Sequence, residues 1–144
     1  MSVPGKEAPE PQEPREVQES AAMDRIFVRD LRLRGIVGIN DWERKKRQDI
    51  VVNLTLYGDF RRAGASDKIE DTLNYRSLTK DVIDHVESSS HYLVEALATE
   101  LARICVVDHG AQRAQVRVEK PAALRFSDSV GIEIDRSRRD FAEE

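Results

Sequence analysis

The spacing of apolar residues along the chain changes twice, and this change restricts the fold more than any other feature of the sequence. Residues 24–39 and 48–60 alternate apolar with polar positions, which is typical of strands that bury one face. The first alternation changes phase near Asp30, which predicts a bulge in a long strand. These segments therefore predict a strand–turn–strand pair with its turn around residues 40–46.

The next segments repeat their apolar residues at helical spacing. This spacing predicts a first helix over 75–87 and a second over 91–107, which His109-Gly110 ends. Alternation returns at 114–118 and 130–134, so two more strands follow. The order ββααββ predicts an α+β domain that has a four-stranded antiparallel sheet with both helices on one face.

The opposite face of such a sheet needs a cover that a chain of 144 residues does not supply. Association of several copies is the natural way to bury it. We therefore expect a homo-oligomer whose binding sites lie at subunit boundaries.

The two ends of the chain differ in composition from its middle. Residues 1–22 hold four of the five prolines and almost no large apolar side chains, so we expect them to be disordered. Residues 137–144 are predicted to form a polar C-terminal tail. The domain itself is predicted to span 23–136.

The composition also narrows the class of protein. No apolar run approaches the roughly 18–20 residues that a membrane-spanning helix needs. The N-terminus lacks the apolar core of a secretory signal. Cys105 is the single cysteine, so the chain has no internal disulfide and no cysteine-built zinc site, and we interpret this residue as core. We predict a cytoplasmic protein without membrane contact.

The charge distribution argues against nucleic acid as a partner. The net charge is −4, and residues 1–22 account for −3 of it, so the domain is nearly neutral, whereas nucleic-acid-binding domains are usually basic. A non-catalytic RNA-binding module using 32–34 and 44–47 remains a remote alternative. Few aromatic residues are available for stacking on bases, which disfavours it.

Four polar residues stand where the pattern predicts ordered structure. Lys120 ends a strand directly before Pro121, Glu95 lies on the first turn of the second helix, Tyr75 begins the first helix and Glu43 lies in the first turn. Each of these positions also suits an ordinary solvent-facing or packing residue. The three histidines show no metal-binding spacing, and no phosphate-loop or dinucleotide-binding motif occurs.

Four ordered blocks resemble one known family. The segments GINDWERKKRQDIVVNL, DTLNYRSLTKDVIDHVE, YLVEALA and VRVEKPAALRFSDSVGIEI resemble the dihydroneopterin aldolase and dihydroneopterin triphosphate 2′-epimerase family, over about residues 23–136. The resemblance implies the tunnelling fold, in which the sheets of several subunits close a β-barrel. It also implies rings that stack as an octamer, and a pterin substrate.

The resemblance further implies roles for individual residues. Lys120, Tyr75 and Glu43 correspond to catalytic positions. Glu95 corresponds to the pterin anchor, helped by the backbone of Leu93 and Val94, while Leu73 and Asn74 accompany Tyr75 from a neighbouring subunit. No metal or organic cofactor is implied.

Two activities of the family stay open. The aldolase splits 7,8-dihydroneopterin by a retro-aldol reaction, and the epimerase performs the same cleavage and then recombines the fragments. DWE (41–43) and VGIEI (130–134) resemble the aldolases, whereas ALRFSDSV (123–130) resembles the epimerases. Arg76, Lys80 and Arg125 are candidate phosphate-binding residues for a triphosphate. We favour the aldolase, with the epimerase as the alternative.

Overall fold

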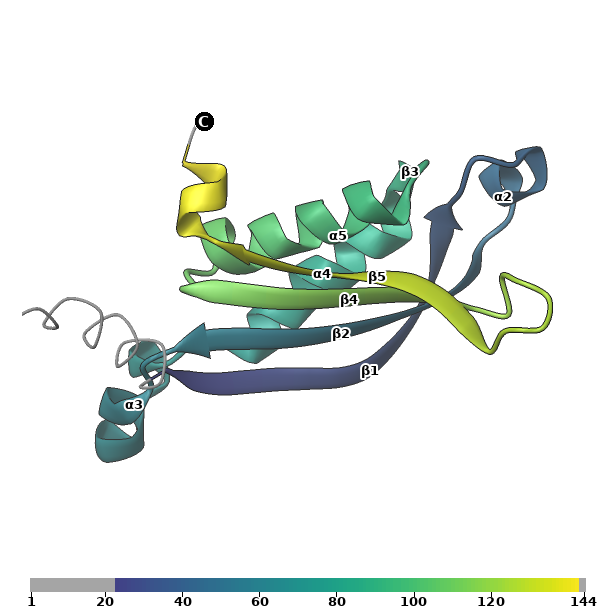
Figure 1. Ribbon diagram of the computed structural model, residues 1–144. Coiled ribbons are helices and arrows are strands. Elements are labelled where there is room, and N and C mark those ends of the chain that lie inside the picture. The colour runs from purple at the N-terminus through teal and green to yellow at the C-terminus, as the bar shows by residue number, and fades with distance from the viewer. Residues whose placement is uncertain (1–22, 143–144) are drawn as a thin grey trace, which may run out of the picture.

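The computed structural model of the chain describes residues 23–142, so the prediction of disorder for residues 1–22 lies outside the described residues. Its main element is a curved sheet in the strand order β3-β1-β2-β4-β5 (Figure 1). The four long strands β1 (Asp24–Val37), β2 (Gln48–Gly58), β4 (Arg113–Pro121) and β5 (Ser129–Ser137) pair antiparallel.

The predicted four-stranded antiparallel sheet needs a correction, because the sheet has a fifth strand and is mixed. Strand β3 (Ser90–His91) pairs parallel with the end of β1, with Ile36 opposite Ser90 and Val37 opposite His91. Two residues are too few to produce an alternating pattern, so periodicity does not detect such a strand.

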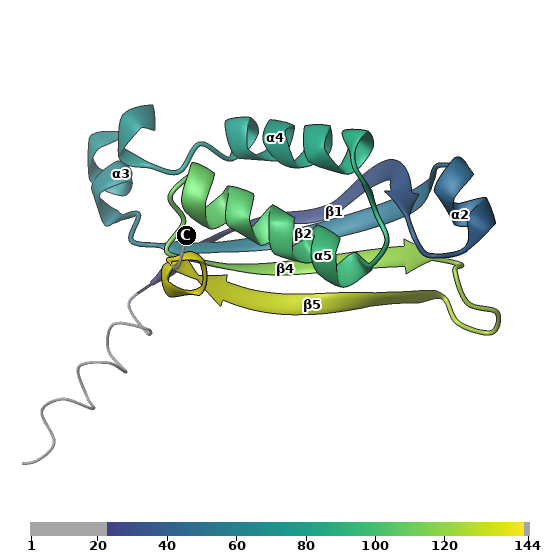
Figure 2. The same cartoon turned by 90° about the horizontal axis from the view of Figure 1, so that it is seen from above.

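Two helices cover one face of the sheet, as predicted. Helix α4 (Tyr75–Ser88) matches the predicted 75–87, while α5 (Val94–Arg103) begins later than predicted and continues as a π-helical turn, Ile104–Asp108. Gly110 follows with a φ of 81°, in the left-handed region that favours glycine. The helices run antiparallel, so α4 and α5 begin at opposite ends of the sheet (Figure 2).

Several short helices were not predicted. Helix α2 (Asp41–Lys45) takes the place of the predicted turn, and α3 (Arg61–Ser66) with the 3-10 turn Ile69–Asp71 connects β2 to α4. The predicted polar tail begins with a 3-10 turn, Arg138–Phe141, and Phe141 packs against the core.

The core lies between the sheet and the two helices. Side chains from β1, β2, β4, α4 and α5 form it, and Cys105 is fully buried there, as predicted. The bulge in β1 is also confirmed: the register with β2 shifts between Val28 and Leu31, and Asp30 has a φ of 57°. The Asp30 N–H donates to Asn53 Oδ1 at 2.8 Å, which satisfies the group that the bulge removes from the ladder.

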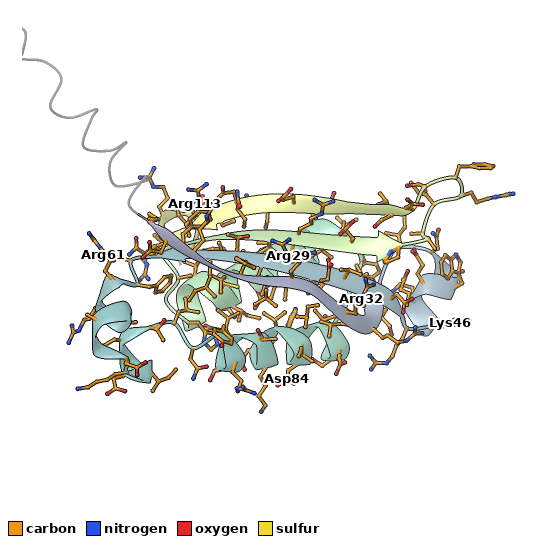
Figure 3. All side chains as sticks on the ribbon, turned by 90° about the horizontal axis from the view of Figure 1, so that it is seen from below. Arg29, Arg32, Lys46, Arg61, Asp84 and Arg113 are labelled. Carbon is orange, nitrogen blue, oxygen red and sulfur yellow. The ribbon has the colours of Figure 1, made fainter. Side chains whose placement is uncertain are left out.

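The other face of the sheet carries no helix. Figure 3 views this face, with Arg29 lying over the strands. A hollow of about 360 Å³ on it is lined by polar side chains from several strands, among them Arg29, Asn53, Arg117 and Glu133.

Candidate functional site

The most deeply buried ion pair of the described residues joins the end of β4 to helix α2. Lys120 Nζ donates to Glu43 Oε2 at 2.7 Å and to the carbonyl oxygen of Val37 at 3.1 Å. The two side chains are 11% and 7% exposed. A charged pair with so little solvent is costly unless each charge is compensated, and buried ionisable groups of this kind are candidates for a functional site.

The local fold of α2 holds Glu43 in place. Glu43 is the third residue of α2, and its Oε1 accepts hydrogen bonds from the backbone N–H and the side-chain amide of Asn40, both at 3.1 Å. This is one half of a capping box, in which a helix-start carboxylate binds back to the residue before the helix. Burial raises the pKa of Glu43, but the hydrogen bonds from Lys120 and Asn40 outweigh it, and the pKa lies below its ordinary value.

Gly38 makes room for this carboxylate. Its φ of 149° suits glycine, and a Cβ added there would lie 2.2 Å from the Glu43 Cδ and Oε1 atoms. Any larger residue at this position would displace the Glu43 side chain.

Glu95 lies at the same end of the molecule, on the first turn of α5. Its side chain is exposed, and within residues 23–142 its carboxylate has no hydrogen-bond partner. Leu93 precedes the helix and is 52% exposed, and Val94 is half-buried. The helix start supplies free N–H groups and a positive dipole end beside Glu95. An acceptor with no internal partner is suited to hold a donor-bearing ligand.

Figures 1 and 2 agree that α2, the start of α5 and the end of β4 share one end of the sheet. Within one subunit, the structure therefore brings Lys120, Glu43 and Glu95 to the same end of the sheet. Leu93 and Val94 lie there as well.

Leu73, Asn74 and Tyr75 lie at the opposite end, where α4 begins (Figure 2). Leu73 is buried, and Asn74 caps α4 by accepting from the N–H groups of Arg76 and Ser77. Tyr75 is 57% exposed. Within one subunit, the predicted site residues thus form two separate sets, one at each end of the sheet.

The candidate phosphate-binding residues are also divided between the two ends. Arg76 and Lys80 are exposed on α4, near Tyr75. Arg125 lies in the loop between β4 and β5, with its guanidinium 5.3 Å from the centre of the fully exposed Phe126 ring. Within one subunit, these three side chains therefore do not form a single phosphate-binding cluster.

Two residues near the ion pair were missed from sequence. Gln48 donates through Nε2 to the carbonyl oxygen of Val37 at 2.8 Å, the same oxygen that Lys120 contacts. Arg44 donates to three backbone carbonyls, described below. The sequence predicts only a turn around residues 40–46 here, because composition does not indicate which member of a charged run turns inward.

Within residues 23–142 no helix has the length and apolar character that crossing a membrane requires. In the same described residues no three His, Cys, Asp or Glu side chains gather as metal ligands would. The cytoplasmic location and the lack of a cofactor stay predictions.

A comparison with protein families identifies the chain. The family model described as dihydroneopterin aldolase (FolB) matches residues 26–135. The chain belongs to the dihydroneopterin aldolase family. This confirms the resemblance noted from the four sequence blocks.

Curated relatives of this family bear two kinds of name. The folic acid synthesis protein FOL1 of Dictyostelium discoideum is 40% identical over 80% of this chain, which spans only 18% of that much longer protein. The dihydroneopterin triphosphate 2′-epimerase of Escherichia coli is 39% identical over 78% of this chain and 94% of its own length.

Solved structures of the family share the fold. A putative dihydroneopterin aldolase from Vibrio cholerae superposes with a TM-score of 0.78 at 33% identity, covering 81% of this chain and 98% of its own. The E. coli dihydroneopterin aldolase in complex with neopterin has a TM-score of 0.76 at 30% identity, covering 79% and 99%.

Proposed function

We propose that the chain is a dihydroneopterin aldolase, which cleaves 7,8-dihydroneopterin into 6-hydroxymethyl-7,8-dihydropterin and glycolaldehyde. The observation that carries the proposal is the buried Lys120–Glu43 pair, 2.7 Å apart, at the same end of the fold as the unpaired Glu95. The neopterin complex of the E. coli aldolase, which shares this fold, supports a pterin as the ligand.

In this proposal Glu95 anchors the pterin ring. Its two carboxylate oxygens accept from the ring 2-amino group and N3–H side by side, an arrangement that gives both strength and orientation. The backbone of Leu93 and Val94 holds the ring edge. The absence of an internal partner for the Glu95 carboxylate among the described residues leaves both oxygens free for this contact.

The cleavage needs proton transfers and no external electron sink. A base removes the 2′-hydroxyl proton, the C1′–C2′ bond breaks and glycolaldehyde departs. The bonding electrons pass from C1′ into the ring C=N at N5, and a proton then returns to C1′. Lys120 is the proposed proton shuttle, with Glu43 holding it and an attendant water in position.

We propose that Tyr75, with Leu73 and Asn74, completes the site from a neighbouring subunit. These residues lie at the opposite end of the sheet from Lys120, and this supports the proposal. A head-to-tail contact between copies would place that end of one subunit beside the Lys120 end of the next. The uncovered sheet face supports a ring whose sheets close the barrel of the tunnelling fold, either as a tetramer or as two stacked rings in an octamer.

The 2′-epimerase is the second candidate. The chain is 39% identical to the E. coli epimerase but 31% identical to the E. coli aldolase, which favours the epimerase. Epimerisation uses the same cleavage and then rejoins the fragments on the other face. Arg76, Lys80 and Arg125 would meet a triphosphate only through contacts between subunits.

Product analysis of the purified protein separates these candidates. With 7,8-dihydroneopterin, the aldolase proposal predicts release of glycolaldehyde and 6-hydroxymethyl-7,8-dihydropterin in equal amounts. Rapid 2′-epimerisation of the triphosphate with little cleavage of either substrate would refute the aldolase proposal and support the epimerase. If neither substrate turned over, the proposal would be wrong.

A further inference from the structure

Arg44, which follows Glu43 in helix α2, contacts three backbone carbonyls from two separate segments. Nη1 donates to the carbonyl oxygens of Gly38 and His91, both at 3.0 Å, and Nη2 donates to that of Ser90 at 2.7 Å. Gly38 follows β1, whereas Ser90 and His91 form β3. The guanidinium therefore connects the end of β1 with a strand that lies 46 residues or more from Arg44 along the chain.

Strand β3 needs such a connection. It has two residues, and a parallel pair of that length makes few backbone hydrogen bonds. The Gly38 N–H adds one bond to the His91 carbonyl at 3.2 Å, and the His91 ring nitrogen lies 2.9 Å from that of His85 on α4. The contact with His85 attaches β3 to the helix layer, and among the side-chain hydrogen bonds of the described residues only those of Arg44 attach it to α2.

Tyr92 extends this connection towards α5. The Arg44 guanidinium carbon lies 3.9 Å from the centre of the Tyr92 ring, a distance at which a cation and an aromatic face attract each other. Leu93, Val94 and Glu95 follow directly. One side chain thus ties the segment that carries Glu95 to the helix that carries Glu43.

We infer that Arg44 is a positioning residue that sets the distance between the pterin anchor on α5 and the Lys120–Glu43 pair. This inference rests on the proposed function, in which Glu95 and the Lys120–Glu43 pair contact opposite ends of one bound substrate. A shift of about 1 Å between a bound substrate and its catalytic group costs about 100-fold in rate.

The chemistry of the contact requires arginine. Its planar fork presents several N–H groups at fixed angles, so two nitrogens reach three carbonyls while the face stacks on Tyr92. Lysine has the same charge but a single nitrogen and no planar face, so it does not replace this contact.

The test compares Arg44→Ala and Arg44→Lys with Lys45→Ala, which removes an equal charge from an exposed neighbour on the same helix. Pterin-binding sites are titrated with 6-hydroxymethylpterin, and kcat on 7,8-dihydroneopterin is expressed per titrated site. A purely structural role lowers the number of sites without changing kcat per site. We expect kcat per site to fall about 10- to 100-fold in both Arg44 variants, while pterin affinity changes less and Lys45→Ala matches the wild type.

Each outcome decides a different claim. Arg44 variants whose kcat per site stays within twofold of the wild type overturn the positioning role and leave the proposed function intact. A wild-type kcat per site in Arg44→Lys overturns the argument that the planar guanidinium is required. If Arg44→Ala does not fold, the result for Arg44→Lys alone decides. A wild-type protein that turns over neither pterin substrate overturns the proposed function itself.

Discussion

Lys120 Nζ and Glu43 Oε2 lie 2.7 Å apart although 77 residues separate them in the chain. Strand β4 delivers the lysine and helix α2 delivers the glutamate, and both side chains are nearly excluded from solvent. The carbonyl oxygen of Val37 accepts from the same lysine nitrogen. The ε-ammonium group is thereby held at a defined point at one end of the sheet, as a proton-transferring group requires.

The pH dependence of stability should reveal the ionised state of Glu43. Because its folded pKa is depressed, Glu43 contributes stability that is present above its ordinary pKa of 4.5 and is lost as the pH falls through the lower folded value. The advantage of wild type over Glu43→Gln in unfolding free energy should therefore be constant above pH 4.5 and shrink below it. Denaturant titrations across this range measure it, and an advantage that grew in acid would contradict the assignment.

Replacing Gly38 by alanine should displace the Glu43 carboxylate, since the new Cβ would lie 2.2 Å from it. We expect a loss of stability of about 1–3 kcal/mol, as for other overpacked sites, and at least a tenfold fall in kcat. Gly64→Ala is the matched control, because no atom lies within 4 Å of its new Cβ. In helix α3 this control should gain up to about 1 kcal/mol. Equal activities of the two variants would refute the role given to Gly38.

Glu95→Gln should weaken pterin binding more than it slows cleavage. The amide keeps the size of the side chain but presents one donor group to the donors of the ring, so one hydrogen bond to a charged group is lost. Such bonds contribute about 1.5–3 kcal/mol, which predicts a dissociation constant for 6-hydroxymethylpterin about 10- to 100-fold higher. Fluorescence titration measures this constant, with Asp84→Asn, which changes an exposed carboxylate within α4, as the control. Unchanged affinity would remove Glu95 from the site.

Mixing two inactive variants tests the shared site. If Lys120 and Tyr75 meet across a subunit boundary, oligomers assembled from Lys120→Ala and Tyr75→Phe chains contain some sites with both native residues. Random assembly at a head-to-tail interface places them together in about a quarter of the sites. We expect activity to return after the two variants are unfolded and refolded together, but not when they are mixed without exchange. Lack of any recovery, with mixed oligomers present, would refute a site that Lys120 and Tyr75 share across a subunit boundary.

The parts of this fold that sequence predicted are those with a repeating local pattern. The two-residue and helical periods identified the four long strands and α4, and the change of phase located the bulge at Asp30. Strand β3 and the short helices α2 and α3 are too brief to show a period, so they were missed.

The candidate site, too, was only partly predictable from the sequence. Lys120, Glu43 and Glu95 were selected as candidates because each charged residue stands at the boundary of an apolar pattern and within a segment that resembles the family. Arg44 and Gln48 were not found, because their importance comes from which carbonyls they contact. Lys45, next to Arg44, carries the same charge and remains exposed, and no sequence pattern distinguishes the two.

The most direct measurement is the rate of glycolaldehyde release from 7,8-dihydroneopterin by wild-type protein and by Lys120→Ala, with 6-hydroxymethylpterin binding measured on both. General acid–base catalysis contributes about 10²- to 10⁴-fold, so we predict a fall in kcat of that size with pterin binding retained through Glu95. A Lys120→Ala protein that binds the pterin and cleaves at the wild-type rate would contradict the account, and Lys120 would be an ordinary strand end.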